Sequence, residues 1–339
     1  MSMNYRTLGR TGVQVSALCL GSMEFGGKTP EDDALRVVDR ALDAGINFID
    51  TANVYGRGVS EEIVGRALER DGKRKGVVLA TKVNVKMRDG DPNASGNHRR
   101  HIMEQAHESL RRLKTDTIDL YYIHRPQSDV PIDETLRALD DLIHQGKVQY
   151  IACSTFAAWS VLEALWVSDR MRLNRFVAEQ PPYHLLERSV ERELIPLAQT
   201  YDLGIMPWSP LAGGLLTGKY TRGNVVEGGR LQPGNAWGDK HFTPAAFEAL
   251  DGLAALAKEK GCSMTQLALG WLLHMPAVTS PVLGPRSVAQ LDEQLGAVDV
   301  KLTPEDLKRI DSISPPGSAL VPYYYTDGFA DFRPHPRRW

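Results

Sequence analysis

Four ionisable side chains lie at, or just beyond, the ends of short apolar segments in the 339-residue sequence. Asp50 ends the first of these segments, and Tyr55 follows in a polar stretch flanked by glycine. Lys82 follows a second apolar segment, and His124 follows a third. Taken singly, each residue has a structural explanation, such as a cap, a packed ring or a solvated charge. Together they predict one cluster, provided that the three segments are neighbouring strands.

The chemistry of such a cluster is proton donation. A phenol is a poor acid at neutral pH, because its ordinary pKa is about 10. A nearby lysine ammonium group favours the phenolate, and a carboxylate beside the lysine keeps it charged and oriented. A histidine can hydrogen-bond the same oxygen or the carbonyl of a substrate. We therefore predict that Asp50 anchors Lys82, and that Lys82 activates Tyr55 to protonate an oxygen that gains negative charge.

A metal site is the enzymatic alternative, with Asp50, His124 and Glu179 as ligands. Lys82 argues against it, because an ammonium group beside a divalent cation is unfavourable. Stoichiometric zinc or manganese in the purified protein would favour this alternative.

Alternation between apolar and amphipathic segments is the main pattern along the chain. Eight short segments are candidate strands, at residues 17–20, 48–50, 77–81, 118–123, 148–153, 176–179, 205–208 and 278–282. Segments of helical length lie between them, at residues 30–44, 60–70, 99–113, 132–145, 156–167, 190–201, 244–259, 264–275 and 287–296. This repeat predicts an α/β fold, a (β/α)8 TIM barrel, with an open doubly wound sheet as the alternative. In a barrel, the carboxyl ends of the strands would bring the four side chains to one rim.

Three stretches lie outside the repeat. Residues 1–16 are typical of a small hairpin ahead of the barrel, residues 217–243 are rich in glycine and polar side chains, and residues 314–339 contain prolines and three tyrosines. Long loops in compact domains are often functional, so we expect the last two near the site. Because the composition does not change in mid-chain, we expect a single domain over residues 1–339.

Composition and charge narrow the classes of function. The formal net charge is −2 and hydrophobic residues make up 42% of the chain, so nothing indicates nucleic acid or an anionic membrane as a partner. No apolar run approaches the ~18 residues of a membrane span, and the N-terminus lacks the apolar core of a signal peptide, so we expect a cytoplasmic protein. Three distant cysteines, Cys19, Cys153 and Cys262, predict neither a disulfide framework nor a metal site.

Several motifs, in order along nearly the whole chain, resemble the aldo-keto reductase superfamily. They are YRTLGRTG at 5–12, GINFIDTANVYG at 45–56, LATK at 79–82, DLYYIHRPQ at 119–127, EQPPYHLLER at 179–188, WSPLAGGLLTGKY at 208–220, LGPRSVAQLDEQLG at 283–296 and LTPE at 302–305. The resemblance implies an NADPH-dependent reductase of small carbonyl compounds on a (β/α)8 barrel, with hydride transfer from nicotinamide C4. It implies that Tyr55 protonates the oxygen, and that Asp50, Lys82 and His124 complete the catalytic set.

The same resemblance implies a set of cofactor contacts. Ser154 and Gln180 would hold the nicotinamide carboxamide, and Trp208 would stack on the ring. Asp50 would also contact the cofactor. The other implied contacts are Gly21, Met23, Ser209, Pro210, Leu211, Gly213, Gly218, Lys219, Gly284, Arg286, Gln290, Glu293 and Gln294. Arg286 would meet the 2′-phosphate of NADPH, because a fork of donors suits phosphate. Residues 217–243 would then lie on the cofactor side of the site.

The chain departs from the family pattern at three positions. Thr155 stands where the family usually has Asn after a serine, His184 where it has Asn after a tyrosine, and Gln294 where it has Asn after Glu. Thr155 has no amide to share in the carboxamide contact, so we expect a changed contact there. None of the three belongs to the catalytic set.

The loops and the tail are expected to form the substrate pocket. Its candidate residues are Phe25, Val54, Met87, Arg125, Trp159 and Tyr183, with the tyrosines at 323–325. Aromatic walls suit sugars, quinones and ketosteroid-like rings alike, and Arg125 would attract an anionic group or pair with a nearby carboxylate. The sequence also resembles the branch with potassium-channel β subunits, so a regulatory binding subunit with residual reductase activity is the second hypothesis. A homo-oligomer is compatible with either.

Overall fold

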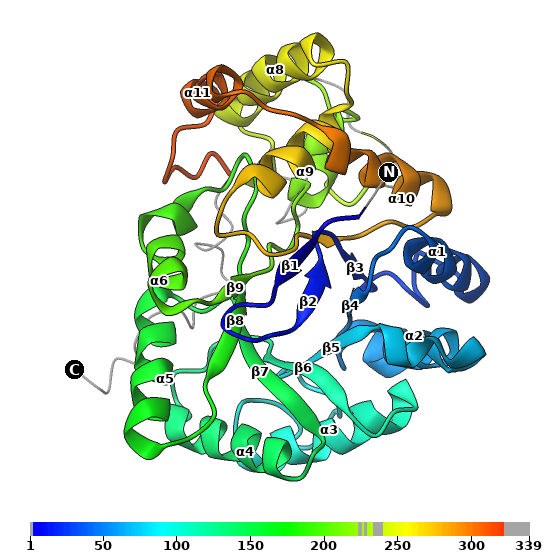
Figure 1. Ribbon diagram of the computed structural model, residues 1–339, viewed down its shortest axis with the longest axis vertical. Coiled ribbons are helices and arrows are strands. Elements are labelled where there is room, and N and C mark those ends of the chain that lie inside the picture. The colour runs from blue at the N-terminus through cyan, green and yellow to red at the C-terminus, as the bar shows by residue number, and fades with distance from the viewer. Residues whose placement is uncertain (1–2, 223–225, 227–228, 233–239, 322–339) are drawn as a thin grey trace.

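The computed structural model describes residues 3–222, 226, 229–232 and 240–321 (Figure 1). Within them, eight parallel strands form one sheet in the order β10-β3-β4-β5-β6-β7-β8-β9. The strands are β3 (Cys19–Gly21), β4 (Phe48–Asp50), β5 (Val78–Val83), β6 (Ile118–Ile123), β7 (Val148–Ser154), β8 (Phe176–Gln180), β9 (Gly204–Ile205) and β10 (Val282–Leu283). Because β10 pairs with β3, the last strand of the chain returns to the first.

Backbone hydrogen bonds also join the two outer strands of this order. Thr279 N donates to Ile205 O at 2.8 Å, and Val282 N donates to Pro207 O at 2.9 Å. The residues that lead into β10 therefore contact β9 and the chain just beyond it, and the sheet curls on itself. The predicted (β/α)8 barrel is confirmed, and the open doubly wound sheet is wrong.

Helices surround the sheet (Figure 1). They are α1 (Glu31–Asp43), α2 (Val59–Glu69), α3 (Arg99–Leu113), α4 (Ile132–His144), α5 (Ala158–Met171), α6 (Leu194–Tyr201), α8 (Pro244–Glu259), α9 (Met264–His274), α10 (Val288–Leu295) and α11 (Pro304–Ile313). Helix α4 shows why they form: Leu136, Leu139 and Leu142 recur on one face and are all buried. Burial of each such side chain contributes about 1.5–3 kcal/mol.

The N-terminal hairpin predicted for residues 1–16 is present as strands β1 (Tyr5–Thr7) and β2 (Gln14–Ser16), which pair antiparallel. Leu8 and Val15 from this hairpin are fully buried in the same cluster as Phe48 and other side chains from the barrel strands. The hairpin therefore packs into the barrel interior and lies across it in Figure 1.

Two predicted strands are shorter than expected. Residues 205–208 contribute only the end of β9, and residues 278–282 contribute only the start of β10. Pro207 and Pro281 interrupt these segments, and proline has no N–H to donate to a strand ladder. Isolated bridges extend the pairing at both places, between Pro182 and Trp208 and between Ile205 and Val278.

The predicted loop 217–243 and tail 314–339 lie partly outside the described residues. The described start of the tail contacts the loop after β8: Arg188 N donates to Ser318 O at 2.7 Å, and Leu320 N donates to Leu186 O at 2.9 Å. The three tyrosines at 323–325 lie outside the described residues. In the part of the chain that is described, no helix is both long enough and apolar enough to span a bilayer.

Candidate active site

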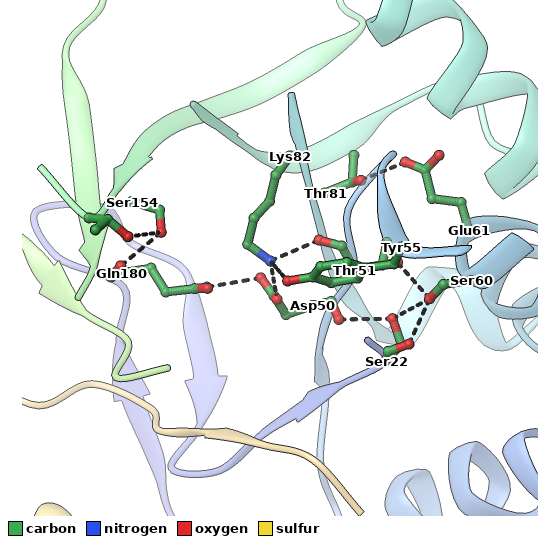
Figure 2. A network of polar contacts seen from close by, with 11 residues as sticks. Ser22, Asp50, Thr51, Tyr55, Ser60, Glu61, Thr81, Lys82, Ser154 and Gln180 are labelled. Carbon is green, nitrogen blue, oxygen red and sulfur yellow. Dashed lines mark hydrogen bonds and ion pairs between the residues drawn. The ribbon is translucent and has the colours of Figure 1, made fainter. Parts of the chain in front are cut away.

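Consecutive strands carry the predicted catalytic side chains to one rim of the barrel. The parallel register pairs Asp50 with Ala80 and Lys82 with Tyr122. The strands β4, β5 and β6 therefore end at neighbouring points, and His124 follows the last residue of β6. Figure 2 shows Asp50, Lys82 and Tyr55 converging there.

Lys82 is the centre of the cluster. Its ammonium group forms an ion pair with Asp50 Oδ1 and donates to Thr51 O at 2.9 Å. It also lies 3.5 Å from the hydroxyl oxygen of Tyr55, to which it donates a long hydrogen bond. The side chain of Lys82 is 0% exposed and that of Asp50 is 2% exposed. A buried charge pair of this kind is costly unless each group is satisfied, which these contacts achieve.

A tight turn places Tyr55 over the strand ends. Tyr55 opens a short 3-10 turn that leads into α2. Gly56 and Arg57 have φ of 57° and 52°, and Gly58 has φ of 104°; the two glycines adopt these values at little cost. The ring of Tyr55 meets that of His124 edge-on, with centroids 5.8 Å apart and an interplanar angle of 83°.

The electrostatics fix the charge states of two of these groups. Burial acts to lower the pKa of Lys82, but attraction to Asp50 and Tyr55 and hydrogen bonds to both outweigh it, and the pKa is raised. Burial, followed by repulsion from Lys82 and Arg125, holds the pKa of His124 well below its usual range. At neutral pH, Lys82 is therefore charged and His124 is neutral. Such a site can stabilise negative charge on the Tyr55 oxygen as its proton leaves.

Gln180 connects the predicted cofactor side to the catalytic cluster. Its Nε2 donates to Asp50 Oδ2 at 3.0 Å, so both carboxylate oxygens of Asp50 have partners. Its backbone oxygen accepts from Ser154 Oγ at 2.9 Å and from Thr155 N at 3.1 Å. The ends of β7 and β8 therefore hold Gln180 against Asp50 (Figure 2).

A buried carboxylate behind the cluster was not predicted. Glu61 on α2 accepts from Thr81 Oγ1 at 2.6 Å and from Arg112 Nε at 2.6 Å. The exposed fraction is 0% for the Glu61 side chain and 8% for that of Arg112. A glutamate in the first turn of a helix is usually solvated, and its partner lies on α3, far along the chain, so no local spacing indicated the pair.

Three hydroxyl groups form a second unpredicted network beside the cluster (Figure 2). Ser60 Oγ lies 3.0 Å from Thr51 Oγ1 and donates to Ser22 O at 2.8 Å. Ser22 Oγ donates to the backbone oxygen of Asp50 at 3.1 Å. The network ties the loop after β3 and the start of α2 to the end of β4, and so holds the chain at Asp50 and Thr51.

Cationic side chains gather on the predicted cofactor side. Burial, followed by repulsion from Arg286 and Lys28, lowers the pKa of Lys219. Gln290 Oε1 accepts from Arg286 N at 2.9 Å. A Cβ on Gly284 would meet nothing within 4 Å, so the backbone here is open. Cations beside an open backbone fit a phosphate group. Lys28 was not among the residues predicted to contact the cofactor.

The glycine-rich turn after β9 has the backbone that a phosphate loop needs. Gly213, Gly214 and Gly218 have φ of 66°, 101° and 78°, where a side chain would be strained. Gly213 N donates to Ser209 Oγ at 3.2 Å. Successive amides in such a turn can face an anion.

The remaining predicted cofactor residues lie at the end of β3, on the loops after β3 and β9, and on α10. They are Gly21, Met23, Trp208, Pro210, Leu211, Glu293 and Gln294. Glu293 Oε1 accepts from Ser263 Oγ at 3.0 Å. Gln294, one of the departures from the family pattern, is buried, and its Oε1 has no hydrogen-bond partner among the residues that the structure describes.

The predicted pocket residues have mixed surroundings. Phe25 is buried in the main core, and Tyr183 is buried with its hydroxyl donating to Glu191 Oε1 at 2.7 Å. Trp159, at the start of α5, is 43% exposed. Val54 and Met87 are half-buried in loops after β4 and β5, so their part in a pocket stays a prediction.

His184, a second departure, is fully buried, and its Nδ1 accepts from Leu186 N at 3.2 Å. Burial, followed by repulsion from His241, holds the pKa of His184 well below its usual range. It therefore stays neutral at physiological pH and anchors the loop that follows β8.

Glu179, a ligand in the alternative metal site, accepts from Phe156 N at 3.1 Å. Burial raises the pKa of its carboxyl group well above the usual range. Among the described residues, no group of three or more His, Cys, Asp or Glu side chains is arranged to hold a metal ion.

Comparisons with known proteins agree on one family. The family model described as "Aldo/keto reductase family" matches residues 17–315. "Uncharacterized oxidoreductase YrpG" of Bacillus subtilis (strain 168) is 40% identical over 333 residues, which covers 95% of this chain and 99% of that protein.

Two plant relatives carry a different name, "Probable voltage-gated potassium channel subunit beta". The protein of Oryza sativa subsp. japonica is 38% identical over 318 residues, and that of Arabidopsis thaliana is 36% identical over 318 residues. Each alignment covers 92% of this chain and 96% of the relative.

Proposed function

Because the chain belongs to the aldo/keto reductase family, we propose that it reduces an aldehyde or ketone reversibly to the alcohol with NADPH. Carbonyl reduction with a nicotinamide cofactor is the general activity of this family. The observation that carries the finer proposal is the buried ammonium group of Lys82, which contacts both Asp50 and the hydroxyl oxygen of Tyr55.

The proposed roles follow from these contacts. Tyr55 gives its proton to the carbonyl oxygen of the substrate. Lys82, held by Asp50, stabilises the negative charge that then grows on the phenolic oxygen. His124 stays neutral and forms a hydrogen bond to the substrate oxygen, which orients the carbonyl group.

The residues present fit an anionic dinucleotide. Arg286 and Lys219, with the open backbone at Gly284, would hold the phosphate groups. Gln180 and Ser154 would hold the nicotinamide carboxamide, with Trp208 against the ring. When bound, NADPH supplies a hydride from C4 of its nicotinamide to the carbonyl carbon.

Oxidation of NADPH against a panel of aldehydes, α-dicarbonyls, keto-sugars and cyclic ketones tests the activity. In Tyr55→Phe, kcat should fall by about 10²–10⁴-fold, because only the proton donor is lost. The Kd for NADPH, measured by quenching of protein fluorescence, should stay within about twofold of the original value. Near-normal turnover by Tyr55→Phe would refute the assigned role.

A second function, as a β subunit of a voltage-gated potassium channel, is supported by the names of the plant relatives. Size-exclusion chromatography with the cytoplasmic domain of a voltage-gated potassium channel tests it. A complex of fixed stoichiometry would support this function, and separate elution at micromolar concentrations would oppose it.

A further inference from the structure

Lys82 and the residue before it, Thr81, point to opposite faces of the barrel wall, because successive side chains of a strand alternate. Lys82 points into the candidate site and pairs with Asp50. Thr81 points away from the site, toward α2, where its hydroxyl donates to Glu61 Oε1 at 2.6 Å. Figure 2 shows the two side chains leaving β5 in these two directions. An effect of Thr81 on the reaction must therefore act through its neighbours.

Glu61 joins this strand to two helices. It lies on α2, and its second carboxylate oxygen accepts from Arg112 Nε, on α3, at 2.6 Å. All three side chains of the resulting series, Thr81, Glu61 and Arg112, are buried. Hydrogen bonds to charged groups are short and strong, and they are stronger still away from water. The series therefore holds β5, α2 and α3 in a fixed arrangement.

Arg112 supports the turn that carries Tyr55. Gly58 ends this turn, and a Cβ on Gly58 would lie only 2.7 Å from Arg112 Cδ. One helical step further along α2, a Cβ on Gly65 would lie 2.5 Å from the backbone oxygen of Arg112. Contacts this close leave room for glycine alone. Helix α2 and the turn before it are therefore packed directly against Arg112.

The two ends of the series thus meet the two groups that must be aligned for proton donation. Thr81 directly precedes Lys82, and Arg112 lies under the turn that Tyr55 opens. The Lys82 nitrogen lies 3.5 Å from the Tyr55 oxygen, at the outer limit of a hydrogen bond. A small movement of β5 relative to the turn would break this contact.

We propose that Thr81 and Glu61 are positioning residues for the reaction. Together with Arg112, they fix the distance between the Lys82 ammonium group and the Tyr55 hydroxyl group. The inference rests on the proposed reductase function. It adds side chains that touch neither substrate nor cofactor to those that determine the rate of proton donation.

Thr81→Val tests the proposal, because it keeps the branched shape and removes the hydroxyl donor. The single-turnover rate of aldehyde reduction by NADPH should fall about tenfold, since a misplacement of about 1 Å can cost that much or more. The Kd for NADPH and the KM for the aldehyde should stay within about twofold of their original values. Thr81→Ser keeps the hydroxyl, and its rate should stay within about threefold of that of the unaltered protein.

Tyr121→Phe is the matched control. Tyr121 is the register neighbour of Thr81 on β6, and its buried hydroxyl has no hydrogen-bond partner among the described residues. Removal of this hydroxyl should leave the single-turnover rate unchanged. Thr81→Ala and Thr81→Ser form a second pair that differs only in the hydroxyl. If Thr81→Val does not fold, about tenfold slower reduction by Thr81→Ala than by Thr81→Ser gives the same answer.

The outcomes separate this inference from the proposed function. A purely structural role for Thr81 would lower the unfolding free energy in urea but leave the rate of the folded Val variant within about threefold of normal, and that result overturns the proposal. Equal rates in the Ala and Ser variants, or an equal loss in Tyr121→Phe, would overturn it too. Reductase activity would stand in each of these cases. If the unaltered protein reduces no carbonyl compound with NADPH, the proposed function and this inference both fail.

Discussion

Replacement of Lys82 by Met removes the ammonium group that faces the Tyr55 hydroxyl. In the single variant, the Asp50 carboxylate would remain buried and charged. Among the described contacts, Gln180 would be its one remaining side-chain partner. Breaking a buried ion pair in this way costs about 3–5 kcal/mol of folding stability, so loss of activity could reflect unfolding. The informative variant is therefore the double variant Asp50→Asn/Lys82→Met, in which both charges are absent.

The expected loss of rate follows from one distance. The Lys82 nitrogen lies 3.5 Å from the Tyr55 oxygen. At an effective dielectric constant of about 20, an ammonium group at this separation stabilises half a unit of negative charge by about 2.4 kcal/mol. That energy corresponds to a decrease of about 60-fold in the rate of the proton-coupled step.

Single-turnover reduction of an aldehyde, followed by NADPH absorbance, measures that step without product release. The unfolding free energy of the double variant in urea should stay within about 1 kcal/mol of the original, because replacing both members of a buried pair is often tolerated. Its Kd for NADPH should change little. A folded double variant that reduces the aldehyde within about threefold of the normal rate would show that Lys82 does not stabilise the Tyr55 oxygen.

Three further predictions follow from other contacts. Arg286→Ala should weaken NADPH binding by about 10- to 100-fold but NADH binding far less; equal weakening in fluorescence titrations would place the 2′-phosphate elsewhere. Arg112→Met should lower the unfolding free energy by about 3–5 kcal/mol, because it leaves the Glu61 carboxylate buried without its ion-pair partner. The double variant Glu61→Gln/Arg112→Met should recover most of that stability in urea melts, and a double variant as unstable as Arg112→Met would contradict the pairing. Burial, followed by repulsion from His98, lowers the pKa of His101 to about 4, so protons favour the unfolded state below pH ~6.5. From pH 7 to pH 5 this group should remove about 2 kcal/mol of stability, and His101→Gln should abolish that part of the loss.

The sequence predicted those parts of the fold that depend on local pattern. The apolar runs at 48–50 and 118–123 are strands with the same bounds in the structure, and the helix predicted for 99–113 is α3. Each run has a clear apolar period and ends at polar or turn residues, so local preference and burial agree there. At 205–208 the apolar run predicted a longer strand than the structure has. The strand is shorter because Pro207 has no N–H to donate to the strand ladder.

In the candidate site, too, some features could be predicted from the sequence pattern and others could not. The neighbourhood of Asp50, Tyr55 and Lys82 could be predicted, because parallel strands that are adjacent in the chain are adjacent in the sheet. The Glu61–Arg112 pair could not, because α2 and α3 meet only through tertiary packing. The left-handed backbone at Thr155, where φ is 63°, could not be predicted either, since Thr itself disfavours that conformation.

The contact between Gln180 and Asp50 has a consequence for the kind of group that the proposed cofactor site would accept. A carboxylate offers no proton, so the nitrogen of the Gln180 amide must face Asp50. In the proposed cofactor site, the amide oxygen of Gln180 would meet the ligand and would require an N–H donor. A ligand with a carboxamide would satisfy that requirement, whereas its deamidated acid would set oxygen against oxygen and bind more weakly.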